Sequence, residues 1–382
     1  MSVYFVYLLS LLNGVSVFAA QMTLSLYALH LGASALTVGV LAGMFSLFPA
    51  LLGVSAGKLI DRAGARRPMV FGTSAGGIGL LLPYFVPAIP ALFVASLMLG
   101  LSIVYFHLAT QNLVGLLSTP QTQARNFSNY TLSISTSQFL GPLSGGFLID
   151  HVNYATTCLV LAVLALLPAA LILWRGKGIP GGMRKPAAAG ATGGGIRRML
   201  KDPLVQRMLV TGCLLSAGLN LYLMYMPVYG HGIGLSASSI GIVMAANATA
   251  AFVVRAVLPQ LMRRYGENQV LTYAFFMSAT GLLLIPFFQS VAVLAAVSFV
   301  FGLGMGCGQP IIIILMYANS ADGRSAEALG LKFSTNQITK VVSPVLFGVL
   351  ASAIGLPPTF WLNAALMAGG GAFSWVYRKK KS

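Results

Sequence analysis

The sequence predicts an all-α integral membrane protein with twelve transmembrane helices. Of its 382 residues, 57% are hydrophobic and only 8% are charged, and the mean hydropathy is +0.85, whereas about a quarter of the residues of a soluble protein are charged. Apolar runs of about 20 residues, the length that crosses the hydrocarbon core as a helix, recur along the chain. We place them near residues 3–28, 37–59, 69–88, 90–117, 127–149, 155–174, 204–228, 237–260, 269–288, 291–317, 328–353 and 357–377.

The distribution of basic residues predicts the orientation of these spans. Twenty of the 23 Lys and Arg residues lie in loops that join even-numbered to odd-numbered spans or in the C-terminal tail, and none lies in the opposite loops. Because basic loops stay on the cytoplasmic side, we expect both termini inside, in a multi-pass monomer of the plasma membrane, here a bacterial inner membrane. The net charge of +17 then reflects topology, with some contact between the tail and anionic membrane lipid, and does not indicate nucleic-acid binding.

A segment rich in Gly, Pro and Ala, residues 176–202, divides the chain into two halves. It predicts a flexible cytoplasmic linker between an N-terminal six-helix bundle, residues 1–175, and a C-terminal six-helix bundle with a basic cytoplasmic tail, residues 203–382. A shift of 202 residues superposes Tyr27 on Tyr229, Gly32 on Gly234, Gly39 on Gly241, Leu59 on Leu261, Arg62 on Arg264, Gly64 on Gly266, Ser96 on Ser298, Gly100 on Gly302 and Pro142 on Pro344. The halves are therefore expected to be pseudo-symmetric copies of one six-span unit.

A charged loop joins the second and third predicted spans, in the stretch GKLIDRAGARRPMV. It matches every position of the pattern G-x-x-x-D-[RK]-x-G-x-[RK]-[RK], through Gly57, Asp61, Arg62, Gly64, Arg66 and Arg67. With twelve spans arranged as six plus six, the chain resembles the major facilitator superfamily of secondary transporters over its whole length. The resemblance implies that these six residues form a conformational latch.

The residue types of this loop suit such a latch. Gly57 is expected to allow close helix packing, and Gly64 to take a positive φ. Asp61 can lie near helix N-termini and pair with a neighbouring base, as the family's aspartate does in one of its two conformations. The second copy of the loop has Arg263 where Asp61 stands, so we expect a one-sided latch.

The fifth span carries the stretch SQFLGPLSGGFLID. Gly141, Pro142, Gly145 and Gly146 resemble the G-P-x-x-G-G core that is typical of exporters in this superfamily, with Ser137 where its leading Gly would fall. A Gly-Pro pair lets two helices approach closely and bends one of them, which predicts a helix pivot at the interface of the halves. The family's drug antiporters have an arginine in the fourth span where this chain has Ser96, which puts their proton relay in doubt here.

Polar residues inside spans are costly in hydrocarbon and are expected to face the interior or water. Three bases lie in spans, Arg255, Lys332 and Lys340, and none of the chain's six acids lies near the middle of a span. Lys332 is close enough to the cytoplasmic end to reach the membrane surface. The candidate substrate-binding residues are Arg255, Lys340, Asn336, Asn247, His107, Gln111, Gln309, Tyr222, Asn13, Gln21 and Asn129. A packing role is open for each of them, and His107 is also a candidate carrier of a coupling proton.

These features predict a secondary active transporter that works by alternating access. The expected function is proton-linked export of a small amphipathic organic compound, an anion by preference, because a buried unpaired cation is costly until an anion joins it. Three alternatives stay open: a multidrug/proton antiporter for apolar or cationic compounds, an importer of organic anions, and a transporter-like receptor. The sequence has no nucleophile-base pair, metal-ligand cluster or phosphate-binding loop, so we expect neither an enzyme nor a bound cofactor or metal.

Overall fold

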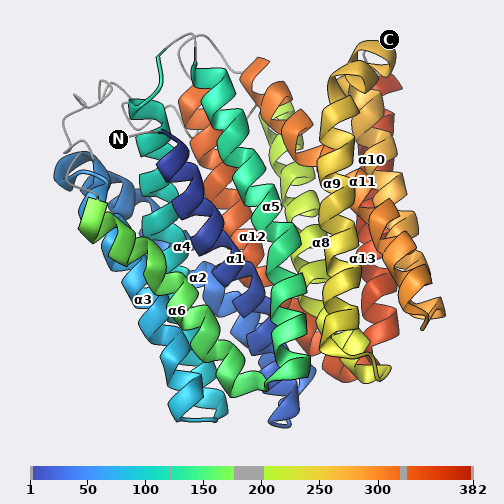
Figure 1. Cartoon of the computed structure of the whole chain (residues 1–382). Coiled ribbons are helices and arrows are strands. Elements are labelled where there is room, and N and C mark those ends of the chain that lie inside the picture. The colour runs from blue at the N-terminus through green and yellow to red at the C-terminus, as the bar shows by residue number, and fades with distance from the viewer. Residues whose placement is uncertain (1–2, 120–121, 176–201, 319–324, 380–382) are drawn as a thin grey trace. The chain divides into compact units, whose positions relative to one another are not determined.

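The computed structural model describes residues 3–119, 122–175, 202–318 and 325–379. Twelve long helices fill these ranges (Figure 1), one for each predicted span, which confirms the all-α fold class. They are α1 (Val3–His30), α2 (Ala35–Ala63), α3 (Arg66–Phe85), α4 (Ile89–Leu116), α5 (Gln123–His151), α6 (Tyr154–Arg175), α8 (Pro203–Gly232), α9 (Ala237–Tyr265), α10 (Glu267–Leu284), α11 (Val291–Ala318), α12 (Ser325–Ile354) and α13 (Leu356–Lys379); the short 3-10 turn η2 (Ile285–Phe287) follows α10. In these described ranges, ten of the helices are long and apolar enough to cross a membrane.

The two sequence repeats begin and end their second helices in the same way. Ser34 accepts a hydrogen bond from the Thr37 backbone N–H at 3.2 Å before α2, and Ser236 accepts one from Ser239 at 3.2 Å before α9. A side-chain oxygen at this position satisfies a backbone donor of the first turn. The helices then end at Gly64 and Gly266, whose φ angles are 77° and 78°. Both residues of each pair lie 202 positions apart, so the duplicated sequence forms the same local turns twice.

The chain forms two compact units. The first comprises Met1–Ala188 together with Gly230–Gly241, and the second comprises Ala189–Tyr229 with Ile242–Ser382. The turn between α8 and α9 therefore belongs with the first unit. The predicted linker, residues 176–202, lies outside the described residues except for Asp202, and the predicted domain boundaries stay predictions.

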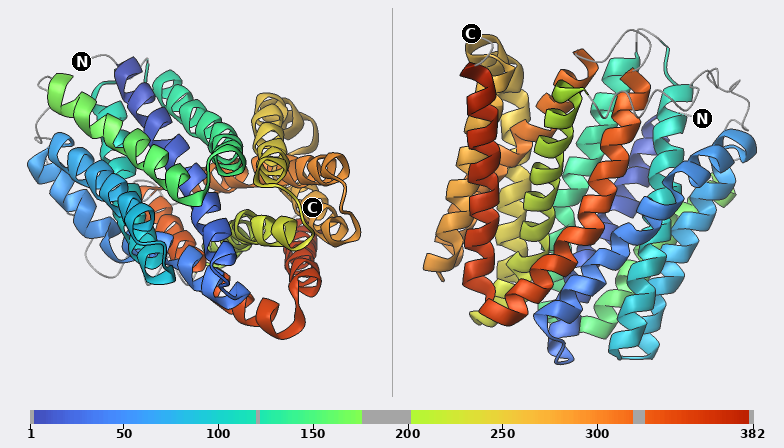
Figure 2. Two further views of the ribbon diagram at one scale, coloured as in Figure 1. Left: turned by 60° about the horizontal axis from the view of Figure 1, so that its bottom comes forward. Right: turned by 180° about the vertical axis from the view of Figure 1, so that it is seen from behind.

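In the first unit, α1 packs against α5, α2 against α4, and α3 against both α4 and α6 (Figure 2). Small residues make these contacts close. A Cβ atom on Gly100 of α4 would lie 3.0 Å from the backbone oxygen of Phe45 in α2, and one on Gly72 of α3 would lie 3.1 Å from the Cβ of Tyr105 in α4. Van der Waals packing of this kind, through small residues, is how helices associate in lipid.

In the second unit, α10 packs against α11 and α13. The closest approaches again occur at glycines. A Cβ on Gly281 of α10 would lie 2.8 Å from the Cβ of Phe301 in α11, and one on Gly218 of α8 would lie 2.8 Å from Met367 in α13. These contacts position α11, which carries Gln309, and α8, which carries Ser216.

Candidate functional site

The charges inside the helices are positive. The six acids of the chain are Asp61, Asp150, Asp202, Glu267, Asp322 and Glu327. Five of them lie in or beside the described helices, each within three residues of a helix end, and Asp322 is outside the described ranges. Arg255 of α9 and both Lys332 and Lys340 of α12 stand farther inside.

A chain of hydrogen bonds links three helices of the second unit. Lys332 of α12 donates from Nζ to Oε1 of Gln309 in α11 at 3.3 Å, and Gln309 donates from Nε2 to Oγ of Ser216 in α8 at 3.1 Å. The Lys332 side chain is only 7% exposed. Of the two placements that the sequence leaves open for Lys332, extension to the membrane surface or an inward position, this structure has the inward one, because the ammonium group has an acceptor inside the unit.

Asn336 adds a further polar group beside this chain. A Cβ atom placed on Gly212 of α8 would lie 3.6 Å from Asn336 Oδ1 and 3.9 Å from Lys332 Cε, with Ile312 Cγ2 at 3.8 Å. Both polar side chains of α12 thus border the small space that the missing side chain of Gly212 leaves. The Oδ1 atom of Asn336 is buried and has no hydrogen-bond partner in the part of the chain that the structure describes.

The first unit carries the equivalent pair of positions. His107 Nδ1 of α4 lies 3.2 Å from the hydroxyl of Tyr130 in α5, which also lies 3.3 Å from Oγ1 of Thr110. A shift of 202 residues takes His107 to Gln309 and Tyr130 to Lys332. Each repeat therefore joins its fourth and fifth helices through a polar contact at the same two positions.

Sequence reasoning selected one member of each pair and missed the other. His107 and Gln309 stand out as polar residues in apolar helices, whereas a single Tyr or Ser is common in a span and Lys332 is near a helix end. The shift of 202 residues that relates the halves also pairs Tyr130 with Lys332. Applied to polar positions, it would have indicated both partners.

The other predicted cationic residues are placed differently. Arg255 is exposed on α9, and Lys340 is half-buried on α12, where its backbone oxygen accepts a hydrogen bond from Asn220 Nδ2 at 3.2 Å. Asn247, two turns from Arg255, is buried where a Cβ on Gly302 of α11 would come within 2.8 Å of its Oδ1. The structure thus joins Asn336 and Gln309 to the region of Lys332, and it places Asn247 at a helix contact.

Two predicted residues are occupied by packing contacts. Tyr222 is fully buried, and its hydroxyl donates to the backbone oxygen of Val243 at 3.5 Å. Asn13 is 1% exposed and accepts a hydrogen bond from Ser102 Oγ at 3.2 Å. In this structure neither presents surface to a ligand. Gln21 and Asn129 are half-buried and Gln111 is exposed, and their roles stay predictions.

The predicted latch loop is described in part. Gly64 has the expected positive φ, 77°, and Arg66 donates from Nη2 to the backbone oxygen of Leu173 in α6 at 3.3 Å, while Arg67 is exposed. Gly57 does not show the expected close packing, since no described atom lies within 4 Å of a Cβ built on it. The side chains of Asp61 and Arg62 lie outside the described residues. The latch therefore stays a prediction.

The glycines of α5 contact two different partners. A Cβ on Gly141 would lie 2.7 Å from the Cβ of Phe18 in α1, and one on Gly145 would lie 3.3 Å from the Cβ of Ala19. Gly146 instead packs on the backbone oxygen of Ala237, and Pro142 contacts Gly241. Gly141 and Gly145 thus pack on α1, and the role of the four residues as a helix pivot stays a prediction.

At its C-terminal end, α5 also carries a hydrogen-bonded acid. Asp150, beyond the predicted hydrocarbon span, accepts from the backbone N–H of Ala237 at 3.0 Å and of Ser238 at 2.8 Å. Partial burial raises the pKa of this carboxyl, but the hydrogen bonds from Ser238 and Ala237 lower it more, so the net pKa is below its ordinary value. The carboxylate thus binds the start of α9, where helix N–H groups favour negative charge.

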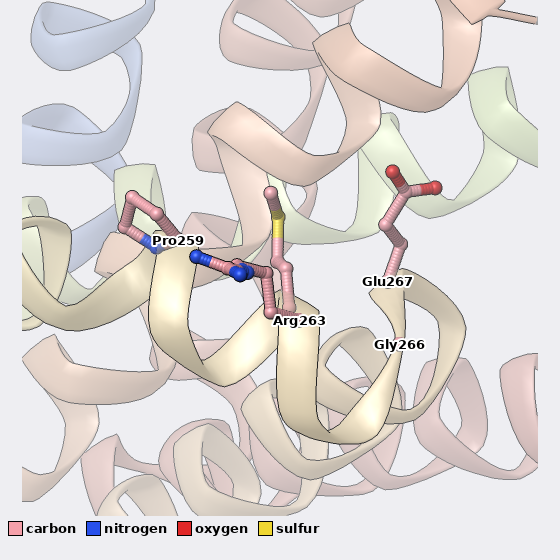
Figure 3. Close-up of a pocket in the computed structure, with 5 residues that line it drawn as sticks. Pro259, Arg263, Gly266 and Glu267 are labelled. Carbon is pink, nitrogen blue, oxygen red and sulfur yellow. The ribbon is translucent and has the colours of Figure 1, made fainter.

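A separate hollow lies at the turn between α9 and α10. It has a volume of about 510 Å³ and is lined by Pro259, Met262, Arg263, Gly266 and Glu267 (Figure 3). This is the second copy of the charged loop, with Arg263 in the place of Asp61. Its lining residues belong to the loop, and none of them belongs to the polar chain that contains Lys332.

The long apolar helices are those of a multi-pass membrane protein. The family profile of the Major Facilitator Superfamily matches residues 6–320 and 264–382. The chain belongs to the Major Facilitator Superfamily. Members of this family are transporters, so the protein is not an enzyme.

Relatives and solved structures agree with this assignment. Multidrug resistance protein 1 of Bacillus subtilis is 22% identical over 89% of this chain and 87% of its own length. Multidrug resistance protein MdtG of Salmonella paratyphi A is 25% identical over 92% of this chain and 89% of its own. The fold is similar to that of a bacterial homologue of the human lysosomal transporter Spinster, with a TM-score of 0.81 and 11% identity over 99% of this chain and 96% of that one.

Proposed function

We propose that this transporter exports a small amphipathic organic anion by alternating access. The observation that carries the proposal is the buried ammonium group of Lys332, with Gln309 as its acceptor, in a helix whose only acid, Glu327, lies near its cytoplasmic end. A buried cation without a counter-charge is costly, and an anionic substrate would offset that cost. Lys340 and Arg255 add positive charge on helices of the same unit.

The proposed direction rests on the residues of α5 and on the relatives. The Gly141-Pro142 pair with Gly145 and Gly146 has the spacing that is typical of exporters, and two relatives are named for multidrug resistance. A close helix contact at small residues allows one helix to rock against another without a bulky side chain in the way. Export is therefore favoured over uptake.

We also propose coupling to protons, in a monomer of the bacterial inner membrane with both termini cytoplasmic. Ser96 replaces the family's span-four arginine and donates from Oγ to the backbone oxygen of Leu92 at 2.9 Å. His107, in contact with Tyr130, is the titratable group that remains on this helix face. The coupling proton would travel on His107 or on the substrate itself.

A second candidate function is multidrug/proton antiport of apolar or cationic compounds. The names of the relatives favour it. The excess of positive charge in the helices disfavours it, because cations would be repelled.

The test is transport by everted membrane vesicles across a panel of anionic, neutral and cationic compounds, at controlled inner and outer pH. We expect Arg255→Gln and Lys340→Gln each to weaken handling of the anions by roughly thirtyfold, the loss of one charged hydrogen bond worth about 2 kcal/mol, and to spare neutral analogues. Equal loss for all charge classes would show that the two bases only hold the fold. Transport of cations by the unaltered protein would establish the multidrug alternative.

A further inference from the structure

We infer that Lys332, with Gln309 and Asn336 beside it, is the subsite that binds the anionic group of the substrate. This inference rests on the proposed function and gives it a location inside the second unit. Lys332 thereby joins Lys340 and Arg255 among the bases that would contact the anion. The ligand class is a small organic anion that carries a hydroxyl or amine close to its carboxylate or phosphate.

The ammonium group of Lys332 has more hydrogen-bond donors than the described residues around it can accept. An ammonium group has three N–H donors and no acceptor, and among the described residues Lys332 has one acceptor, Gln309 Oε1 at 3.3 Å. The amide of Gln309 is itself oriented by Ser216 at 3.1 Å, so its oxygen is held toward Lys332. The donors that remain suit the oxygens of an anion, which forms stronger hydrogen bonds to a cation than a neutral amide does.

Asn336, one helical turn after Lys332, has a hydrogen-bond acceptor that no described residue uses. Asn336 Oδ1 is buried and has no hydrogen-bond partner among the described residues. A buried acceptor in this state costs about 1–3 kcal/mol. It lies in the space beside Gly212 that Lys332 Cε also borders, so a ligand hydroxyl or amine would satisfy it while the ligand's anionic group binds Lys332.

The two repeats differ in charge at the equivalent pair of positions. The equivalent contact in the first unit joins His107 to Tyr130, two residues that can both be neutral. In the second unit the same two positions hold Gln309 and Lys332. Lys332 is 7% exposed, so the second repeat carries a charge at a position where the first repeat has a phenol. The difference between the copies is a positive charge, which supports an anion as the ligand of the second one.

The test measures binding of three matched probes to the purified full chain in detergent, by equilibrium dialysis. The probes are 2-hydroxybenzoate, benzoate, which lacks the hydroxyl, and 2-hydroxybenzamide, which lacks the charge. We expect 2-hydroxybenzoate to bind most tightly. Lys332→Met should weaken its binding by about tenfold or more, since a charged hydrogen bond is lost, and should leave 2-hydroxybenzamide unchanged. Lys332→Arg should restore most of the affinity.

Two further variants test the subsite independently of whether Lys332→Met folds. Gln309→Glu places a carboxylate against Lys332 and should abolish binding of both anions even if Lys332→Met does not fold. Arg175→Gln, at the exposed C-terminal end of α6, removes one positive charge elsewhere and should change nothing. Equal affinity of the unaltered chain and Lys332→Met for 2-hydroxybenzoate, or no binding of either anion by the unaltered chain, would overturn the inference.

Transport measurements distinguish a wrong subsite from a wrong proposed function. If vesicles export organic anions and Lys332→Met exports them equally well, the subsite is elsewhere and the proposed function stands. If the unaltered protein exports only cations, the proposed function fails as well.

Discussion

Gly64 is the residue of the charged loop whose role follows most directly from its backbone conformation. Its backbone angles, φ 77° and ψ 169°, lie in a region that is populated almost only by glycine, and holding another residue there costs about 1–3 kcal/mol. Gly57, seven residues earlier in the interior of α2, has no described atom within 4 Å of the position that a Cβ would take. The two glycines of one motif therefore have opposite tolerance for a methyl group.

We expect Gly64→Ala to lower the free energy of unfolding by about 1–3 kcal/mol. Gly57→Ala should leave it unchanged or raise it by up to about 1 kcal/mol, because alanine is the better helix former. Unfolding of the purified chain in mixed micelles by denaturing detergent measures both. Equal destabilisation by the two variants would mean that Gly57 is packed as tightly as the motif suggests.

Some residues of the candidate site can be recognised from the sequence alone, and Lys332 cannot. His107, Gln309 and Asn336 are visible in the sequence because polar side chains in apolar helices are rare. Lys332 is harder to interpret, since a lysine near a helix end can extend to the surface or turn inward. The choice depends on an acceptor, Gln309, which is 23 residues away in sequence and on another helix. Only the fold brings the two together.

At the scale of helices, Asp150 holds the first turn of α9 to the end of α5. It accepts two hydrogen bonds from this turn, at 3.0 and 2.8 Å. The same turn also packs on α5 through the contacts of Gly146 with Ala237 and of Gly241 with Pro142. The repeat has Ser352 at the equivalent of Asp150, so only one copy carries the acid. From this turn α9 continues into the second unit.

We expect Asp150→Asn to speed amide hydrogen exchange in residues 233–241 at neutral pH, because an amide side chain offers one acceptor where the carboxylate offers two. The lowered pKa gives the sign of the pH dependence: the contact is fully present above the ordinary Asp value of about 3.9 and is lost as the pH falls through the lowered pKa. The variant and the unaltered protein should then converge in acid.

The matched control for this experiment is Asp202→Asn. Asp202 accepts from the backbone N–H of Leu204 at 2.9 Å at the start of α8, so it makes the same kind of contact within its own helix. It should leave exchange in residues 233–241 unaffected. Unchanged exchange in Asp150→Asn at neutral pH would show that the glycine contacts alone hold this turn.

The contact between α1 and α5 gives a second prediction for helices. Gly141→Leu should destabilise the folded protein by about 1–3 kcal/mol or more, because its side chain would overlap Phe18 and Ala19 of α1. Gly369→Leu, at an exposed position of α13 with no described atom within 4 Å, should be tolerated. Thermal aggregation of the detergent-solubilised protein compares them. A stable Gly141→Leu variant would mean that α1 and α5 separate easily.

The helices themselves follow closely from the sequence, and their ends do not. All twelve predicted spans are helices, but α9 continues to Tyr265, past the apolar run that ends near residue 260, and α5 begins at Gln123, ahead of residue 127. Hydropathy reports the part of a helix that lies in hydrocarbon. The polar turns beyond it stay helical because their backbone hydrogen bonds do not depend on lipid.

For the whole molecule, the duplicated sequence explains why the same local turns occur in both halves, while one polar pair differs between them. The turns at Ser34 and Ser236 and the glycines at Gly64 and Gly266 are the same in both. The polar pairs differ, with His107 and Tyr130 in one copy and Gln309 and Lys332 in the other. Under the proposed function, His107 would carry the coupling proton and Lys332 would bind the anion.

The most direct test of this account is transport by the purified full chain in liposomes that contain no other protein. With a proton gradient imposed across the membrane, we predict uphill movement of 2-hydroxybenzoate that stops when a protonophore collapses the gradient, with little gradient-driven movement of 2-hydroxybenzamide or of a quaternary ammonium compound. Gradient-driven movement of the ammonium compound, without movement of the anion, would contradict the account.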